Sequence, residues 1–211
     1  MTGEATSMPV AGHESASAST ENILLPRARV YIDLAYLAGQ QRRWIQETKE
    51  PGRDEFYRVH IGPVIDAIRR RFEVTCVNVY DAVPADGSRA ARASWHDQLR
   101  QHSHIRLHLR PSLYAPHFEQ KEVDVQLAID MVSESDEKTR NVVLVSGDHD
   151  FVPAIDLVRR LGVSVTVAAF FQTHTYRQMR LAANDILDLD DEPLVGLRWL
   201  PEAPSTPEEP E

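Results

Sequence analysis

Residues Val142–Phe151 read Val-Val-Leu-Val-Ser-Gly-Asp-His-Asp-Phe, and this stretch decides the fold. Its apolar half is typical of a buried parallel strand, and the apolar residues that follow Phe151 are spaced as in a helix. The strand therefore ends at Ser146, directly before Asp148 and Asp150. Open α/β sheets bind their ligands at the carboxyl ends of their strands. Two neighbouring carboxylates repel each other unless a cation or a proton lies between them, so this turn is a candidate metal site.

Strand and helix patterns alternate along the chain. The predicted strands are Arg29–Asp33, Val74–Tyr80, Ile105–Leu109, Val142–Ser146 and Val163–Ala169. The predicted helices are Ala35–Thr48, Val59–Arg71, Arg89–His102, Val123–Ser133, Phe151–Leu161 and Thr175–Ala182. This alternation predicts a three-layer α/β fold, in which helices cover both faces of a central parallel sheet. The expected strand order is 3-2-1-4-5, which brings the first and fourth strands together at the switch point of the sheet.

Length and composition predict one domain with two tails. The chain has 211 residues, of which 42% are hydrophobic and 26% are charged, as in ordinary globular proteins. We expect a disordered arm at residues 1–26, a folded domain at 27–192 and a disordered acidic tail at 193–211. No apolar run approaches the roughly 20 residues of a membrane span, and no secretory signal is visible. A cytoplasmic location without a membrane partner is therefore expected, in keeping with the single cysteine, Cys76.

Most of the net charge of −9 lies in the two tails, and the central part of the chain is mildly basic. Nearly all of its positive charge comes from arginine, whose guanidinium group matches phosphate oxygens well. An arginine-rich genome would explain the same composition equally well. The charge therefore permits a nucleic-acid partner without requiring one.

Two further aspartates lie where strands end or helices begin. Asp33 closes a predicted strand, and Asp124 opens a predicted helix. A helix N-terminus by itself stabilises Asp124, so the case for a metal site rests on several aspartates meeting in one place. With the order 3-2-1-4-5, Asp33, Asp148 and Asp150 flank one crevice, and the helix of Asp124 can start at its edge. Mg²⁺ or Mn²⁺ would relieve the repulsion between four carboxylates and activate water at a phosphodiester.

Other residues near this crevice are assigned from their positions alone. Asp130 is about 120° from Asp124 around the helix and should not face the same ion. His149 is expected to point away from its two neighbours. Ser146 could hydrogen-bond a ligand carboxylate or the attacking water, and Lys121 could hold a phosphate, although structural roles fit both residues as well. If the substrate is a nucleic acid, Arg42, Arg43 and Arg89 are candidates for contacts to its backbone, because they follow strand ends near the crevice.

At this point the chain resembles the NYN domain of the PIN-like ribonuclease superfamily, and within it the LabA-like branch. The resemblance covers about residues 28–190. It rests mainly on two motifs, Lys121-Glu-Val-Asp124 and Ser146-Gly-Asp-His-Asp-Phe151, in this order and spacing. It implies a Rossmann-like, PIN-like fold and a Mg²⁺- or Mn²⁺-dependent endoribonuclease. The implied metal ligands are Asp33, Asp124, Asp148 and Asp150.

The first motif departs from the family pattern. The family commonly has Ile-Asp-Gly-x-Asn-Leu, whereas this chain has Ile32-Asp-Leu-Ala-Tyr-Leu37. The asparagine is thus replaced by Tyr36, and the glycine by Leu34. Tyr36 could stack on a base, or it could abolish the task of the asparagine.

These observations favour an endoribonuclease that cleaves single-stranded or structured RNA. A catalytically weak module that binds RNA or protein is the alternative, which the substitution at Tyr36 favours. A phosphatase or a DNA nuclease could use the same ions, since carboxylate chemistry does not identify the sugar. No phosphate-binding glycine loop or nucleophile elbow is present, which argues against nucleotide-loop and serine-hydrolase chemistry. The oligomeric state stays open, with a homodimer as one option.

Overall fold

The computed structural model describes residues 24–48, 61–84, 96–112, 121–136, 138–171 and 177–191. The predicted acidic tail and all but the end of the predicted N-terminal arm lie outside these residues. The elements are β1 (Arg27–Asp33), α1 (Leu34–Thr48), α2 (Gly62–Arg69), β2 (Glu73–Pro84), β3 (Ile105–Ser112), α4 (Lys121–Ser133), β4 (Asn141–Val145), the 3-10 turn η1 (His149–Phe151), α5 (Val152–Arg160), β5 (Ser164–Ala169), α6 (Arg177–Ala182) and β6 (Asp185–Asp188). Residues 96–100 are also helical.

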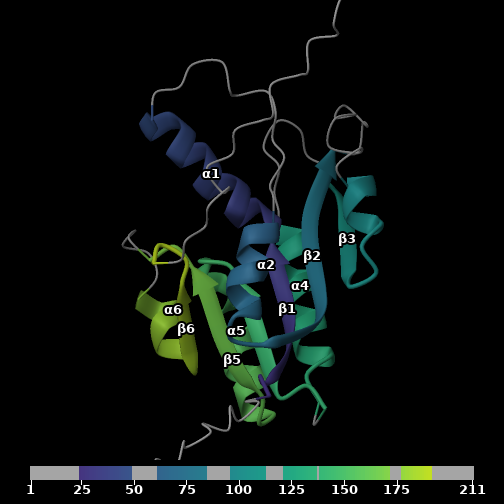
Figure 1. The fold of residues 1–211 in the computed structure, drawn as a ribbon, viewed down its shortest axis with the longest axis vertical. Helices are drawn as coiled ribbons and strands as arrows, with labels where there is room; N and C mark the ends of the chain where they lie inside the picture. The colour runs from purple at the N-terminus through teal and green to yellow at the C-terminus, as the bar shows by residue number, and fades with distance from the viewer. Residues whose placement is uncertain are drawn as a thin grey trace, which may run out of the picture.

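The strands form one parallel sheet in the order β3-β2-β1-β4-β5-β6 (Figure 1). The predicted order 3-2-1-4-5 is confirmed, and β6 extends the sheet beside β5. The sequence pattern does not predict β6, because this strand has four residues with an aspartate at each end. A buried parallel strand is recognised by a continuous apolar run, which so short an edge strand lacks.

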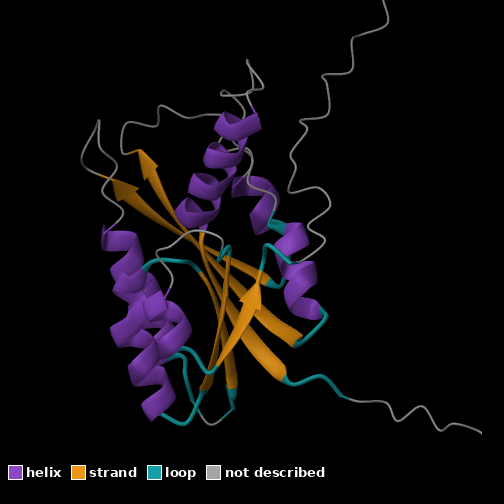
Figure 2. Ribbon diagram, turned by 90° about the vertical axis from the view of Figure 1, so that its left-hand side faces the viewer, coloured by secondary structure: helices purple, strands orange, loops and turns teal. Residues whose placement is uncertain are grey.

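Helices cover both faces of the sheet (Figure 2). On one face, α1, α2 and the helix at 96–100 pack on apolar residues such as Val30 and Ile32 of β1. On the other face, α4, α5 and α6 pack around residues such as Tyr31 and Leu144. The predicted three-layer architecture is thereby confirmed. Among the helices of the described ranges, none has the length and apolar character needed to cross a bilayer.

The bounds of several elements differ from the prediction. Ser146 lies just beyond β4, which begins at Asn141. Phe151 belongs to η1, and α5 begins at Val152 with Pro153 in its first turn, a position that suits proline because the N–H there has no helical partner. Of the helix predicted at Arg89–His102, the structure describes a helix only at 96–100, and residues 85–95 lie outside the described part.

A polar cluster anchors the end of α4 to the sheet. The Tyr31 hydroxyl group donates to Oε2 of Glu134 at 2.9 Å, and Nη1 of Arg29 donates to the same oxygen at 3.0 Å. Nη1 of Arg106 on β3 lies 3.3 Å from the other carboxylate oxygen of Glu134. Since Tyr31 is fully buried, its hydroxyl group depends on this carboxylate for a partner. Glu134 therefore connects α4 to β1 and β3.

We expect the Glu134→Ala variant to lose about 2 kcal/mol of stability, because a buried hydroxyl group and a partly buried guanidinium group lose their acceptor. The melting temperature should fall by about 4–8 °C, as measured by circular dichroism. Glu73→Ala is the control, because the ion pair of Glu73 with Arg27 is long, at 3.7 Å, and exposed. That variant should lose less than about 1 kcal/mol. Equal losses in the two variants would contradict the anchoring role of Glu134.

Candidate metal centre

Four aspartates come from three neighbouring elements at the carboxyl end of the sheet. Strands β1 and β4 pair directly, with Ile32 opposite Val145. Asp33 is the last residue of β1, and Asp148 and Asp150 follow β4. The topology thus brings the ends of two strands together, although more than 100 residues separate them in the sequence. Asp124 lies in the first turn of α4. This helix packs on the face of the sheet that contains Tyr31 and Leu144.

Asp33 is held in one orientation by two hydrogen bonds. Its Oδ1 accepts from the backbone N–H of Tyr36 at 3.1 Å, and its Oδ2 accepts from the Ser146 hydroxyl group at 3.0 Å. Both Asp33 and Ser146 are buried. The first bond is the one that an aspartate directly before a helix makes to a backbone N–H of the first helical turn. The second bond joins the ends of β1 and β4.

The turn after β4 is built by its own side chains. The Ser146 hydroxyl group accepts from the backbone N–H of Asp148 at 3.1 Å. Oδ1 of Asp148 in turn accepts from the backbone N–H of Asp150 at 2.9 Å, which caps η1. Short polar side chains favour such turns because they satisfy backbone donors locally. Ser146 therefore fixes Asp33 and the 148–150 turn relative to each other.

The carboxylates act on one another electrostatically. Burial raises the pKa of Asp124 to about 7, with repulsion from Asp33, Asp148 and Asp150 adding to it. Burial, reinforced by repulsion from Asp148, raises the pKa of Asp33 to about 6, although its hydrogen bonds to Tyr36 and Ser146 oppose the shift. Burying several carboxylates without a positive charge to balance them costs free energy. The cluster therefore favours a proton or a cation.

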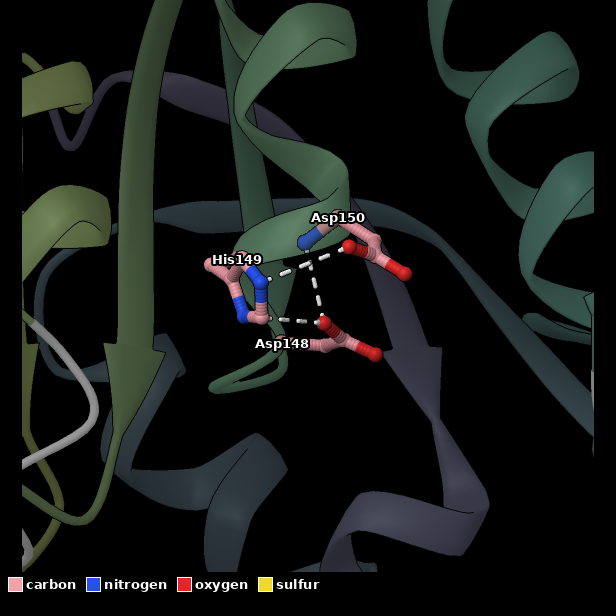
Figure 3. Close-up of side chains that lie close together, drawn as sticks. All are labelled: Asp148, His149 and Asp150. Carbon is pink, nitrogen blue, oxygen red and sulfur yellow. Dashed lines mark hydrogen bonds and ion pairs between the residues drawn. The ribbon is translucent and has the colours of Figure 1, made fainter.

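His149 does not point away from the aspartates, so the expectation for this residue is wrong. Its Nδ1 lies 3.7 Å from Oδ1 of Asp148, and its Nε2 lies 3.6 Å from Oδ1 of Asp150 (Figure 3). In an extended strand, a residue between two ligands would point away from them, because successive side chains face opposite ways. Residues 149–151 instead form a 3-10 turn, in which that alternation does not hold.

The donor set fits a hard divalent cation. One ligand atom from each of Asp148, His149 and Asp150 lies within 4.8 Å of the others. Carboxylate oxygens are the ligands that Mg²⁺ and Mn²⁺ take in proteins. A buried carboxyl group with a raised pKa, at Asp33, lies beside this group. Among the described residues, Asp148, His149 and Asp150 thus form a group whose chemistry fits such an ion, and the predicted ligands Asp33 and Asp124 do not belong to this group.

The comparison with protein families identifies the chain. The family model of the NYN domain matches residues 27–190, which is most of the chain. The chain belongs to the NYN domain family. Membership implies the PIN-like superfamily and a nuclease-like fold, in agreement with the resemblance seen in the sequence. The model does not distinguish the LabA-like branch, which stays a prediction.

One solved structure agrees with the fold of this NYN domain. A protein of unknown function from Vibrio parahaemolyticus shares 18% identity with a TM-score of 0.58, and the match covers 81% of this chain and 97% of that one. A protein described as a putative haloacid dehalogenase-like hydrolase, from Burkholderia xenovorans, shares 13% identity over 83% of this chain and 100% of that one, with a TM-score of 0.35. A search of curated proteins finds none that matches the chain.

The structure describes the side chains of only some of the residues predicted to bind substrate in this NYN domain. Ser146 is buried against Asp33, so its observed contacts are structural. The Tyr36 hydroxyl group accepts the backbone N–H of Phe170 at 2.8 Å, and its ring packs against both cores. Arg43 is exposed on α1. The side chains of Arg42 and Lys121, and all of Arg89, lie outside the described residues.

Two other acids, on α4 and β2, have partners of their own. Oδ2 of Asp130 accepts from the Tyr80 hydroxyl group at 2.9 Å, as expected for a residue that faces away from the cluster. Asp81 is buried within β2, with its Oδ2 2.9 Å from Nε2 of His96. Strand alternation puts Asp81 on the face opposite to Tyr80 and thus away from the cluster. The sequence offers no periodic signal for the pair Asp81–His96, because the two residues come from separate elements.

Proposed function

We propose that this NYN domain is an endoribonuclease that hydrolyses RNA phosphodiesters with Mg²⁺ or Mn²⁺ held by Asp33, Asp124, Asp148 and Asp150. One observation carries the proposal: Asp148, His149 and Asp150 offer ligand atoms within 4.8 Å of one another at the carboxyl end of the sheet, and burial and three neighbouring carboxylates raise the pKa of Asp124 beside them to about 7. Titratable groups that are strongly perturbed at the ligand-binding edge of a sheet are functional-site candidates. Membership in a family of generally nuclease-like domains supports the same reaction.

A divalent ion bound by these carboxylates would supply positive charge for the scissile phosphate and lower the pKa of the attacking water. The residues of the chain provide the positioning. The Ser146 hydroxyl group and the Tyr36 backbone N–H keep Asp33 from rotating. The N–H of Asp150 orients Asp148 in the same way. Asp150 is the most exposed member of the cluster, with 79% of its side chain accessible.

The proposal is tested by incubating labelled RNA with the purified chain in Mn²⁺, Mg²⁺ or EDTA, beside the Asp33→Asn and Asp148→Asn variants. We expect metal-dependent cleavage that is lost in both variants. A DNA strand of the same sequence tests the choice of sugar. Cleavage that persists in EDTA or in both variants would reject the site.

Ser146→Ala is expected to lower the affinity for Mn²⁺ by about 10–100-fold, because the variant removes the hydroxyl group that orients Asp33 and the backbone of Asp148. Isothermal titration calorimetry measures this affinity without any need for activity. Ser133→Ala serves as the control, because it removes an exposed hydroxyl group on α4. This variant should bind Mn²⁺ as the parent chain does. Unchanged affinity in Ser146→Ala would show that the orientation of Asp33 does not depend on this bond.

Tyr36 favours a second candidate, a catalytically weak module that binds RNA or protein. The phenol replaces the asparagine common in the family, and its hydroxyl group is bonded to the backbone of Phe170. In this chain the phenol instead joins the start of α1 to the residue that follows β5. RNA that is retained in a gel-shift assay but not cleaved in Mn²⁺ would support this candidate over the nuclease.

A further inference from the structure

We infer that His149 is a nitrogen ligand of the proposed metal centre, and that it makes the centre prefer Mn²⁺ to Mg²⁺. The inference rests on the proposed function, because it concerns the same ion. It adds a ligand that the aspartate pattern does not contain, and it chooses between two ions that the carboxylates alone do not separate.

The position of the imidazole ring carries the inference. Nδ1 faces Asp148 and Nε2 faces Asp150, at 3.7 Å and 3.6 Å from their nearest carboxylate oxygens (Figure 3). Whichever ring nitrogen binds the ion therefore does so beside a carboxylate. The ring is 56% exposed, so tight packing does not force it into this place. The turn η1, which Asp148 caps, brings the three side chains together.

The three side chains are close without being directly hydrogen-bonded through the ring, because one ligand atom from each of Asp148, His149 and Asp150 lies within 4.8 Å of the others. A hydrogen bond from a ring nitrogen to a carboxylate oxygen is usually about 2.7–3.2 Å long, so both separations are too long. Ligands at about 2.1 Å from one octahedral ion lie about 3.0 Å apart when adjacent and about 4.2 Å apart when opposite. Both observed distances lie between these two spacings, so the three side chains reach a common ion after a small adjustment, which the exposure of the ring permits.

An imidazole ligand changes which ion is preferred. Mg²⁺ takes oxygen ligands and keeps several of its waters, so a nitrogen donor adds little to its affinity. First-row transition ions accept imidazole readily, and Mn²⁺ is the member of that series that also suits a carboxylate-rich site. Three or four carboxylates with one imidazole should therefore bind Mn²⁺ more tightly than Mg²⁺.

The test compares the full chain with its His149→Gln variant, using Mn²⁺ and Mg²⁺ as probes. Calorimetry should show that the substitution weakens Mn²⁺ binding at least about 10-fold and changes Mg²⁺ binding less than about 3-fold. Pulsed electron paramagnetic resonance of bound Mn²⁺ should show coupling to a ¹⁴N nucleus in the parent chain and none in the variant. His102→Gln is the matched control, since His102 is exposed before β3, at the opposite end of the sheet.

The outcomes separate this inference from the proposed function. Nitrogen coupling that persists in His149→Gln, or equal losses for Mn²⁺ and Mg²⁺, would overturn the role of His149. Asp148→Asn tests the centre itself in the same two measurements. If Asp148→Asn abolishes Mn²⁺ binding while His149→Gln matches the parent chain, only the inference about His149 fails. If both variants bind Mn²⁺ like the parent chain, the proposed centre fails as well.

Discussion

Asp124→Asn should lower Mn²⁺-dependent RNA cleavage by at least about 100-fold and leave the metal-free fold slightly more stable than before. The loss follows because the variant removes a charged ligand from the proposed centre. The gain follows because burial and three neighbouring carboxylates all oppose the charge of Asp124. Since the side chain is only partly buried, we expect about 1 kcal/mol or less, which is a rise of roughly 2–4 °C in the melting temperature.

Glu122→Gln is the matched control for this prediction. Glu122 and Asp124 are both acids in the first turn of α4, so each interacts favourably with the helix dipole. Glu122 is exposed, and its neutralisation should therefore leave cleavage intact. If the two variants cleave RNA equally well, Asp124 is present for the helix alone. If Asp124→Asn is destabilised, the four carboxylates do not repel one another as the proposal requires.

The metal-free protein should become less stable as the pH rises from about 5 to 8. The folded-state pKa values of Asp33 and Asp124 are about 6 and about 7, above their unfolded value of 3.8. In this window the folded state binds more protons than the unfolded state, so stability falls with rising pH. Asp124 has the larger shift, but it is only partly buried and solvent screens its interactions, so its contribution is reduced. Together the two groups should cost about 2 kcal/mol, or roughly 4–8 °C in melting temperature.

Thermal unfolding in EDTA at pH 5, 6, 7 and 8 measures this dependence. Burial lowers the pKa of His104 and of His108, and these groups act in the opposite direction. The relevant quantity is therefore the difference between the parent chain and its Asp33→Asn and Asp124→Asn variants. The pH slope should flatten in each variant, and saturating Mn²⁺ should reverse it in the parent chain because the ion competes with protons. Identical slopes in the three proteins would contradict the raised pKa values.

The order of the sheet could be predicted because each central strand is a continuous apolar run. Val142–Val145 and Val165–Ala169 are buried on both faces, and only a parallel sheet between two helix layers buries a strand in this way. The proximity of Asp33 and Asp148 could be predicted for the same reason, since the order 3-2-1-4-5 makes their strands neighbours. The edge strand β6 has no such run and was missed.

The sequence by itself determined the layers, the strand order and the edge of the sheet at which the aspartates lie, because apolar periodicity and chain connectivity contain that information. Only the tertiary structure decided the contacts at that edge. Ser146 is bonded to Asp33, 113 positions away, and the Tyr36 hydroxyl group to the backbone of Phe170, 134 positions away. The direction of His149 depends on a 3-10 turn rather than on strand alternation. Side-chain direction and hydrogen bonding depend on local backbone angles and on neighbours from distant segments, which no periodic pattern records.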